Sequence, residues 1–89
     1  MSQNFDPNQN CYKINKKDSV PLVFIHGVGL DHQMWNYQVS YFNEFSTLTY
    51  DLLGHGKTPC NKDQLSLRDF SNQLLEVLDH LKVEKINLI

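Results

Sequence analysis

Apolar residues in this chain form short blocks, and the pattern inside each block predicts an element of secondary structure. The clearest block is "PLVFIHG" (Pro21–Gly27), where four consecutive apolar residues follow a proline and precede His-Gly. A run that is apolar on both faces suits a strand buried on both sides, as in a parallel sheet. Residues 46–53 ("STLTYDLL") alternate and are rich in threonine, so they form a second predicted strand, and residues 85–89 ("KINLI") open a third.

The start of the chain carries weaker signals. Residues 1–10 are polar, so we expect a disordered tail ahead of a folded region that covers residues 11–89. Residues 11–17 ("CYKINKK") alternate loosely, which suits a strand. That strand is predicted to be one arm of a hairpin that turns at residues 17–19.

A first helix is expected between the strands 21–27 and 46–53. Asp31 is a suitable N-cap for a helix across residues 31–45, because its side chain accepts a hydrogen bond from a free backbone N–H. The side chains expected near one side of that helix are Met34, Trp35, Gln38 and Phe42.

A second helix has the clearest helical pattern in the chain. Ser66 is a natural N-cap, and Asp69 follows three residues later, close to a capping box and favourable at the positive helix end. Apolar residues then recur at spacings of three and four, which predicts one buried helix face ending near Lys82. The residues of that face are Leu67, Phe70, Leu74, Val77, Leu78 and Leu81.

The order strand, helix, strand, helix, strand predicts an α/β fold with right-handed crossovers and a parallel sheet. The chain stops inside an apolar strand, which would leave an unprotected apolar edge in such a sheet. We therefore expect these residues to be the front piece of a larger protein.

The composition limits the class of protein to which the chain can belong. The chain has 89 residues, 40% of them hydrophobic, and a net charge of −2, as in one small soluble globular domain. No basic surplus points to nucleic acid, no apolar run is long enough for a membrane span, and the polar start is not a secretory signal. Oligomeric state is not readable from these features.

The cysteines and histidines give no metal-binding pattern. Cys11 and Cys60 are isolated, without C-x-x-C spacing, so reduced thiols in a cytoplasmic setting are expected, with a disulfide as the alternative. The four histidines do not pair at i, i+4, and no cysteine lies near any of them in the sequence. We therefore expect no metal site, and no feature of the sequence calls for a cofactor.

One short stretch resembles the end of a phosphate-binding loop. Gly56-Lys57-Thr58 fits the last positions of G-x-x-x-x-G-K-[ST], but the first position is occupied by Asp51. A carboxylate there would repel a phosphate. A nucleotide-binding domain is therefore a weak alternative, and another reason is needed for the two glycines that flank His55.

A second stretch, "HGVG" (His26–Gly29), directly follows the first buried strand. Its glycines allow the backbone to turn sharply and to approach a ligand closely. Ligands of open α/β sheets bind at the carboxyl ends of the strands, which is where this turn lies. Taken alone, the motif also fits an ordinary turn from a strand to a helix.

Together the motifs are more informative. "FIHGVGLDHQMW" and, about two dozen residues later, "YDLLGHGKT" resemble the amino-terminal part of the α/β-hydrolase fold family. Members commonly read D-x-x-G-H-G-x-S at the second motif, and Thr58 replaces that serine here. The resemblance covers residues 21–89 and implies a mixed, mainly parallel sheet. It is closest to the small esterases, lactonases and carbon–carbon-bond hydrolases, whose substrates are modest acyl compounds.

The resemblance also implies roles for single residues. The backbone N–H of Val28 would be one donor of the oxyanion hole, which stabilises the charged oxygen of a tetrahedral intermediate. Substrate would meet the adjoining loop at Gly27, Gly29 and Leu30. Trp35 would line the acyl pocket or belong to the core. The residues expected to support the loops structurally are His26, Asp51, Gly54, His55 and Gly56.

The nucleophile of such an enzyme is not in this chain. Family members carry it at a G-x-S-x-G elbow after a strand, followed by Asp or Glu and then His, and no G-x-S-x-G occurs here. Ser40, Ser66 and Ser71 lie in predicted helices, and His80 lies near a helix end. The resemblance thus implies a Ser-His-Asp triad beyond Ile89 and an inactive fragment, with a non-catalytic α/β interaction module as the alternative.

Overall fold

The computed structural model describes residues 4–60 and 62–89. A search of these residues found no helix with the length and apolar character needed to cross a membrane. The elements in chain order are β1 (Asn4–Phe5), β2 (Cys11–Asn15), β3 (Leu22–Ile25), the 3₁₀ helix η1 (His32–Trp35), α1 (Asn36–Tyr41), β4 (Thr47–Tyr50), α2 (Leu67–Leu81) and β5 (Asn87–Leu88).

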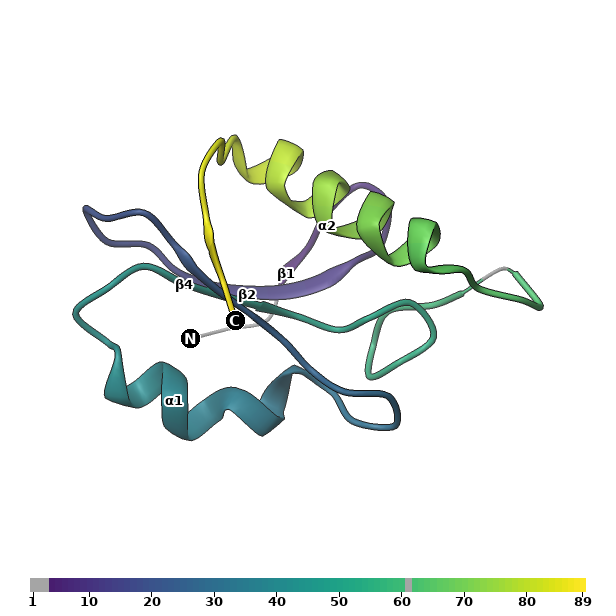
Figure 1. Ribbon diagram of the computed structural model, residues 1–89, viewed down its shortest axis with the longest axis horizontal. Helices are drawn as coiled ribbons and strands as arrows, with labels where there is room; N and C mark the ends of the chain where they lie inside the picture. The colour runs from purple at the N-terminus through teal and green to yellow at the C-terminus, as the bar shows by residue number, and fades with distance from the viewer. Residues whose placement is uncertain (1–3, 61) are drawn as a thin grey trace.

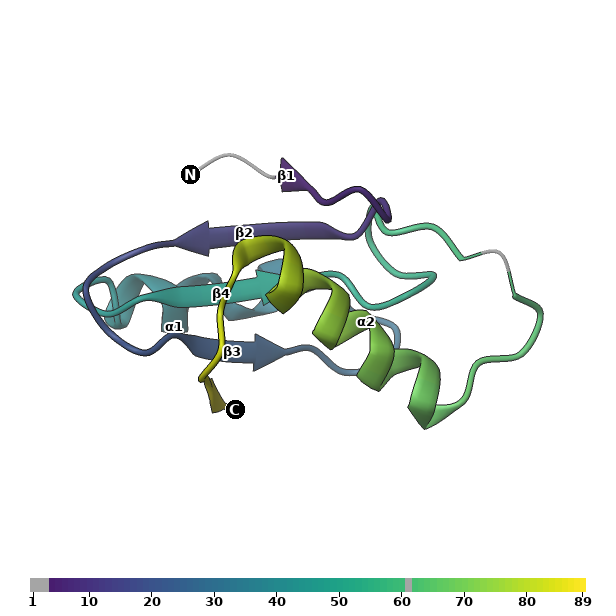
Figure 2. The ribbon, with the colours of Figure 1, turned by 90° about the horizontal axis from the view of Figure 1, so that it is seen from above.

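The strands form one sheet with the order β1-β2-β4-β3-β5. β3 pairs in parallel with β4 and with β5, whereas β2 pairs antiparallel with both β1 and β4. α2 covers one face of the sheet, and η1 with α1 covers the other (Figure 1). Figure 2 shows β4 between β2 and β3, with α2 lying across the sheet. The predicted α/β class with a mixed sheet is confirmed.

The core follows the alternation of side chains along the central strands. Val23 and Leu48 are fully buried and join the apolar cluster that Val77 of α2 completes. Phe24 points to the opposite face, because successive residues of a strand alternate. There its ring centroid lies 5.1 Å from that of Trp35. Trp35 therefore packs on the sheet as a core residue does.

The predicted hairpin at residues 17–19 is wrong. β2 and β3 are not neighbours, because β4 inserts between them and pairs with both. Tyr12 and Ile14 of β2 belong to or pack against the apolar cluster under α2, and this long-range burial holds β2 beside β4. A local turn pattern contains no information about such an insertion.

The predicted tail also differs from the structure over residues 4–10, while residues 1–3 lie outside the described part. Asn4 and Phe5 pair with Tyr12 and Cys11. Asp6 is 4% exposed, and its carboxylate accepts hydrogen bonds from the backbone N–H groups of residues 8 and 10, each at 2.9 Å. A carboxylate that satisfies its own turn in this way orders a polar segment without any apolar pattern.

The first helix is shorter than predicted. Asp31 does act as its cap, accepting a hydrogen bond from the backbone N–H of Gln33, but a 3₁₀ turn precedes α1, which ends at Tyr41. Two of the four side chains expected on one side, Met34 and Gln38, are exposed. With few buried anchors, tertiary packing does not extend the helix to residue 45.

The second helix is confirmed with its cap. The side chain of Ser66 accepts from the Asp69 N–H, and the Asp69 side chain accepts from the Ser66 N–H, which completes the capping box. Lys82 ends the helix in a left-handed conformation. Leu67, expected on the buried face, is instead 86% exposed because it stands at the first turn, beyond the edge of the sheet cluster.

Replacing Ser66 by alanine is expected to lower the free energy of unfolding by about 1 kcal/mol, because one N-terminal N–H loses its acceptor. Urea unfolding measures this loss. Ser71→Ala is the matched control, since Ser71 is exposed in the middle of the same helix. Equal losses for the two variants would contradict the capping role of Ser66.

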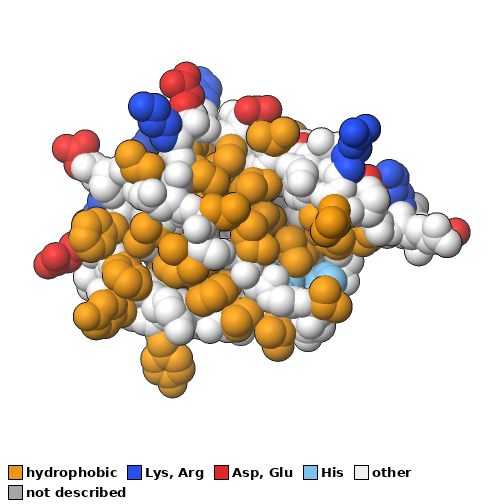
Figure 3. Space-filling view, in the orientation of Figure 1, with side chains coloured by type: hydrophobic (Ala, Val, Ile, Leu, Met, Phe, Trp, Pro, Cys, Tyr) orange, Lys and Arg blue, Asp and Glu red, His pale blue; other side chains and the backbone are white. Residues whose placement is uncertain are grey.

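The last strand exists but is shorter and less buried than predicted. β5 pairs only with β3, at the edge of the sheet, and Leu88 and Ile89 are 58% and 56% exposed. Hydrophobic side chains gather over the face of the molecule on which β5 lies (Figure 3). The described residues thus leave this sheet edge and much apolar surface uncovered.

Candidate active site

The two motifs singled out in the sequence meet at one end of the sheet. β3 and β4 are parallel, with Ile25 opposite Tyr50, so the residues that follow them leave the sheet side by side. His26 is the first residue after β3 and Asp51 is the first residue after β4. These two segments are called the first exit, or β3 exit, and the second exit, or β4 exit. Their juxtaposition follows from the strand direction, because carboxyl ends of parallel strands lie at the same edge.

His26 joins the two exits directly. Its side chain is 4% exposed, and its Nε2 accepts a hydrogen bond from the backbone N–H of Leu52 at 3.0 Å. Its Nδ1 lies 2.7 Å from the carbonyl oxygen of Gly27. Because Nε2 is an acceptor, the ring proton is on Nδ1 and is donated to that carbonyl. The ring of His55 covers that of His26 at a centroid distance of 5.2 Å.

The loop after His26 forms a tight turn. The N–H of Leu30 donates to the carbonyl oxygen of Gly27 at 3.2 Å, and Gly29 has φ of +85°, which matches a type II turn. The Val28 side chain at the tip is 86% exposed. Among the described residues, no group accepts a hydrogen bond from the Val28 N–H.

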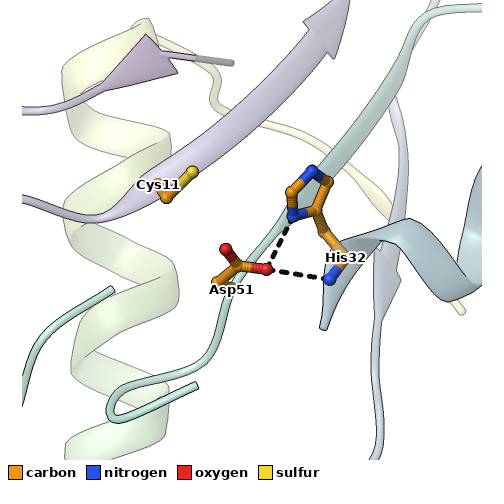
Figure 4. Close-up of side chains that lie close together, drawn as sticks. All are labelled: Cys11, His32 and Asp51. Atoms are coloured by element: carbon orange, nitrogen blue, oxygen red, sulfur yellow. Dashed lines mark hydrogen bonds and ion pairs between the residues drawn. The ribbon is translucent and has the colours of Figure 1, made fainter. Parts of the chain in front are cut away.

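Asp51 is the anchor of the second exit. It is 1% exposed, and its Oδ1 accepts from the backbone N–H of His32 at 2.8 Å and from Nδ1 of the same residue at 2.6 Å. Its Oδ2 accepts from the backbone N–H of Lys57 at 3.0 Å. The carboxylate therefore ties the start of η1 to the turn after β4 (Figure 4).

This arrangement explains the glycine that follows His55. Gly56 has φ of +49°, and a Cβ on it would overlap the Asp51 carboxylate, so only glycine fits. The N–H of Lys57, which would face a phosphate in a nucleotide site, is bonded to that carboxylate. His55 has a structural contact, with its Nδ1 3.0 Å from the carbonyl oxygen of Leu53. This geometry argues against the nucleotide-binding alternative.

Thr58 keeps the hydroxyl that a serine would supply at this position. Its Oγ1 accepts a hydrogen bond from the backbone N–H of Cys11 at 2.9 Å, and the side chain is 3% exposed. The N–H of Asp51 donates to the carbonyl oxygen of the same cysteine at 2.9 Å. The Thr58 hydroxyl, a group that serine also has, thus fixes the turn to β2.

The fold also brings together residues that the sequence keeps apart. The expectation of no metal site rested on sequence spacing, yet the donor atoms of Cys11, His32 and Asp51 all lie within 4.8 Å of one another (Figure 4). Burial and then the charge of Asp51 raise the pKa of Cys11 to about 11, so its thiol is protonated at neutral pH. Of these three side chains, His32 and Asp51 are joined by a hydrogen bond of 2.6 Å.

Two residues of this region were missed by the sequence analysis. His32 had no recognisable partner, because it is paired with a residue 19 positions away. Gln73 is 1% exposed on α2, where its Nε2 donates to the carbonyl oxygen of Asp51 at 2.8 Å and its Oε1 accepts from the Leu53 N–H at 3.1 Å. A signal for Gln73 existed, because it stands three residues after Phe70 and four before Val77, on the apolar face.

Comparison with known proteins shows the family to which the chain belongs. The sequence model of a family described as "alpha/beta hydrolase fold" matches residues 20–89. The chain belongs to this family.

Individual members give the same result. The chain is 29% identical over 82 residues to "(E)-2-((N-methylformamido)methylene)succinate hydrolase" of Acinetobacter baylyi, covering 91% of this chain and 31% of that protein. It is 33% identical over 75 residues to "3-oxoadipate enol-lactonase 1" of the same organism, covering 82% and 28%. A bromoperoxidase structure from Bacillus anthracis superposes with a TM-score of 0.88 at 26% identity, covering 98% and 34%. The chain thus spans about a third of the length of these α/β-hydrolase relatives.

Acid is expected to weaken the fold through Asp51. Burial raises the pKa of this carboxyl, but the hydrogen bonds from Lys57 and His32 outweigh burial and hold the pKa below the ordinary 3.8. The stabilisation is therefore complete above the unfolded-state pKa and is lost as the pH falls through the lower folded-state pKa. Urea unfolding between pH 6 and about pH 2 measures the decline.

Asp69 is a second carboxyl whose pKa is lowered, and it provides the comparison for that experiment. The hydrogen bond from Lys62 lowers the pKa of Asp69 to about 2, but this side chain is 18% exposed, whereas that of Asp51 is 1% exposed. Asp51→Asn is expected to remove more of the acid dependence than Asp69→Asn, because only the first group is buried among its donors. A larger effect of Asp69→Asn would contradict the assignment to Asp51.

Proposed function

We propose that this chain is the oxyanion-hole part of an α/β-hydrolase that cleaves carboxylic esters, lactones or related acyl bonds through a serine nucleophile. In this proposal the Val28 N–H is one oxyanion donor, and the residue after the nucleophile provides the other. The Ser-His-Asp triad lies beyond Ile89. The substrate is a small acyl compound that contacts the loop at Gly27, Gly29 and Leu30.

The observation that carries the proposal is the unpartnered N–H of Val28 at the tip of a fixed turn. A donor that makes no hydrogen bond inside the described residues is available to a ligand. Donors held in place before the reaction stabilise a developing oxyanion without reorganisation at the moment of reaction. The turn also lies at the carboxyl ends of β3 and β4, where ligands of α/β sheets bind.

The relatives favour acyl chemistry and leave the substrate open. Two of the compared proteins are named as a hydrolase of a substituted succinate and as an enol-lactonase. A third, with a closely superposing fold, is named as a bromoperoxidase. Since one fold supports several activities, the choice among esters and lactones depends on parts of the protein other than these residues.

The test begins with the coding sequence after the Ile89 codon. We expect an open frame that encodes G-x-S-x-G within a few codons of it. The complete protein is expected to hydrolyse p-nitrophenyl acetate and to be labelled by a fluorophosphonate at the serine of that motif. Replacing that serine by alanine should abolish both. A stop codon directly after Ile89, or hydrolysis that survives the replacement, would overturn the proposal.

The 89-residue chain gives a complementary result. It contains no G-x-S-x-G, so it is expected to show no turnover of p-nitrophenyl acetate above buffer. Turnover that is lost when Ser40, Ser66 or Ser71 is replaced would show that the nucleophile lies inside the chain.

A further inference from the structure

The loop that carries Val28 is held at both ends by a buried histidine. His26 precedes the loop and His32 follows it, and their side chains are 4% and 2% exposed. Both rings contact the exit of β4 at consecutive residues. His26 contacts the N–H of Leu52 at 3.0 Å, and His32 contacts the Asp51 carboxylate at 2.6 Å.

The two rings use opposite chemistry and different ring atoms. His26 accepts a hydrogen bond through Nε2, the atom far from its own backbone. His32 donates through Nδ1, the near atom, because a carboxylate is acceptor only. Each contact specifies one ring nitrogen, because Nε2 of His26 must lack a proton to accept and Nδ1 of His32 must carry one to donate.

Little else in the described residues fixes the tip of the loop. Within the turn the contact is the 3.2 Å bond from the Leu30 N–H to the Gly27 carbonyl oxygen. A Cβ placed on Gly29 would have no atom within 4 Å, so the space on that side of the residue is open. The position of the Val28 N–H must therefore be set mainly where the loop begins and where it ends.

The β4 exit is in turn well fixed. The Asp51 N–H donates to the carbonyl oxygen of Cys11 at 2.9 Å, and Gln73 donates to the Asp51 carbonyl oxygen at 2.8 Å. These bonds attach residue 51 to β2 on one side and to α2 on the other. The ring of His32, which contacts Asp51, and that of His26, which contacts the adjoining Leu52, are therefore held in a fixed position relative to the sheet.

We propose that His26 and His32 are positioning residues that form a two-point clamp and set the place of the Val28 N–H relative to the reacting carbonyl. This inference rests on the proposed function, because it concerns the same oxyanion donor. The clamp has no contact with the substrate in this scheme. It acts by keeping the donor where the oxyanion forms, so its loss lowers kcat more than it raises KM.

The opposite chemistry of the two rings allows a crossed test in the complete protein. The amide of asparagine reaches the place of Nδ1, and the amide of glutamine reaches the place of Nε2. His32→Asn keeps a donor toward Asp51 and His32→Gln loses it. His26→Gln keeps an acceptor toward Leu52 and His26→Asn loses it.

We expect H32Q and H26N to lower kcat for p-nitrophenyl acetate by about 10- to 100-fold, because a misplacement of about 1 Å costs on that order. H32N and H26Q should recover much of the loss, with KM little changed in all four. H80N and H80Q are controls, because His80 is exposed on α2 and lies outside the clamp. Thermal unfolding shows which variants are folded, and inhibition by a boronic acid that mimics the tetrahedral intermediate reports the same order of effects.

The outcomes separate this inference from the proposed function. Equal effects of Asn and Gln at both positions, or losses confined to KM, would overturn the clamp. The comparison of Val28→Pro with Val28→Ala tests the oxyanion donor independently. A large loss for V28P without the crossed pattern would retain the donor and reject the clamp. If V28P and V28A have equal kcat, the donor itself is rejected, and the clamp with it.

Discussion

Replacing Val28 by proline in the complete protein is expected to lower kcat by about 100- to 1,000-fold, because proline has no N–H and an oxyanion-hole donor contributes on that order. The substitution is compatible with the turn. Val28 is the second residue of a type II-like turn, where proline is favoured. The preceding Gly27 has no Cβ to collide with the proline ring. The measurement is steady-state hydrolysis of p-nitrophenyl acetate.

Val28→Ala is the matched comparison. It truncates a side chain that is 86% exposed and keeps the backbone N–H. The ratio of kcat between V28A and V28P therefore isolates the donor from the side chain. Equal thermal unfolding midpoints for the two variants establish that the turn has formed in both. A ratio near one would contradict the assignment of this N–H to the oxyanion hole.

The largest effect on stability is expected at Gly56. Replacing it by alanine puts a Cβ into the Asp51 carboxylate, which must move away from its hydrogen-bond donors. Displacing a buried charge from its partners costs about 3–5 kcal/mol of the free energy of unfolding. Urea unfolding of the complete protein measures this loss.

Gly29→Ala separates backbone strain from the collision. Gly29 also has a positive φ, of +85°, but a Cβ there meets nothing within 4 Å. Its substitution is expected to cost only the strain of a left-handed residue, about 1–2 kcal/mol. Similar losses at positions 29 and 56 would mean that strain dominates and that the contact with Asp51 contributes little.

Elements whose signals lie within one or two helical turns were predictable. The capping box of Ser66 and Asp69 spans three residues, and the apolar face of α2 repeats every three or four. The four apolar residues of β3 are contiguous. Such signals depend on neighbours along the chain, so the sequence displays them directly. The paired glycine motifs similarly pointed to two turns at the ends of strands.

Strand order was decided by tertiary structure. β4 enters between β2 and β3, which a loose hairpin pattern at residues 17–19 did not indicate. The burial of Tyr12 and Ile14 under α2 stabilises this order, in which β2 and β3 are not paired with each other. Since burial free energy depends on area removed from water, and not on sequence distance, local turn propensity is overridden here.

Local patterns in the sequence were enough to indicate the family, the second helix with its cap, and the two glycine-containing turns, because each depends on residues close together along the chain. The resemblance already indicated His26 and Asp51 as supports of those turns, but the partners of these residues were set by the tertiary structure. The pairing of His32 with Asp51 spans 19 residues, and Gln73 reaches the Asp51 carbonyl oxygen across 22. These contacts exist because parallel strands bring their carboxyl ends together and α2 packs over them, and hydrogen-bond partners chosen by packing leave no periodic signal in the sequence.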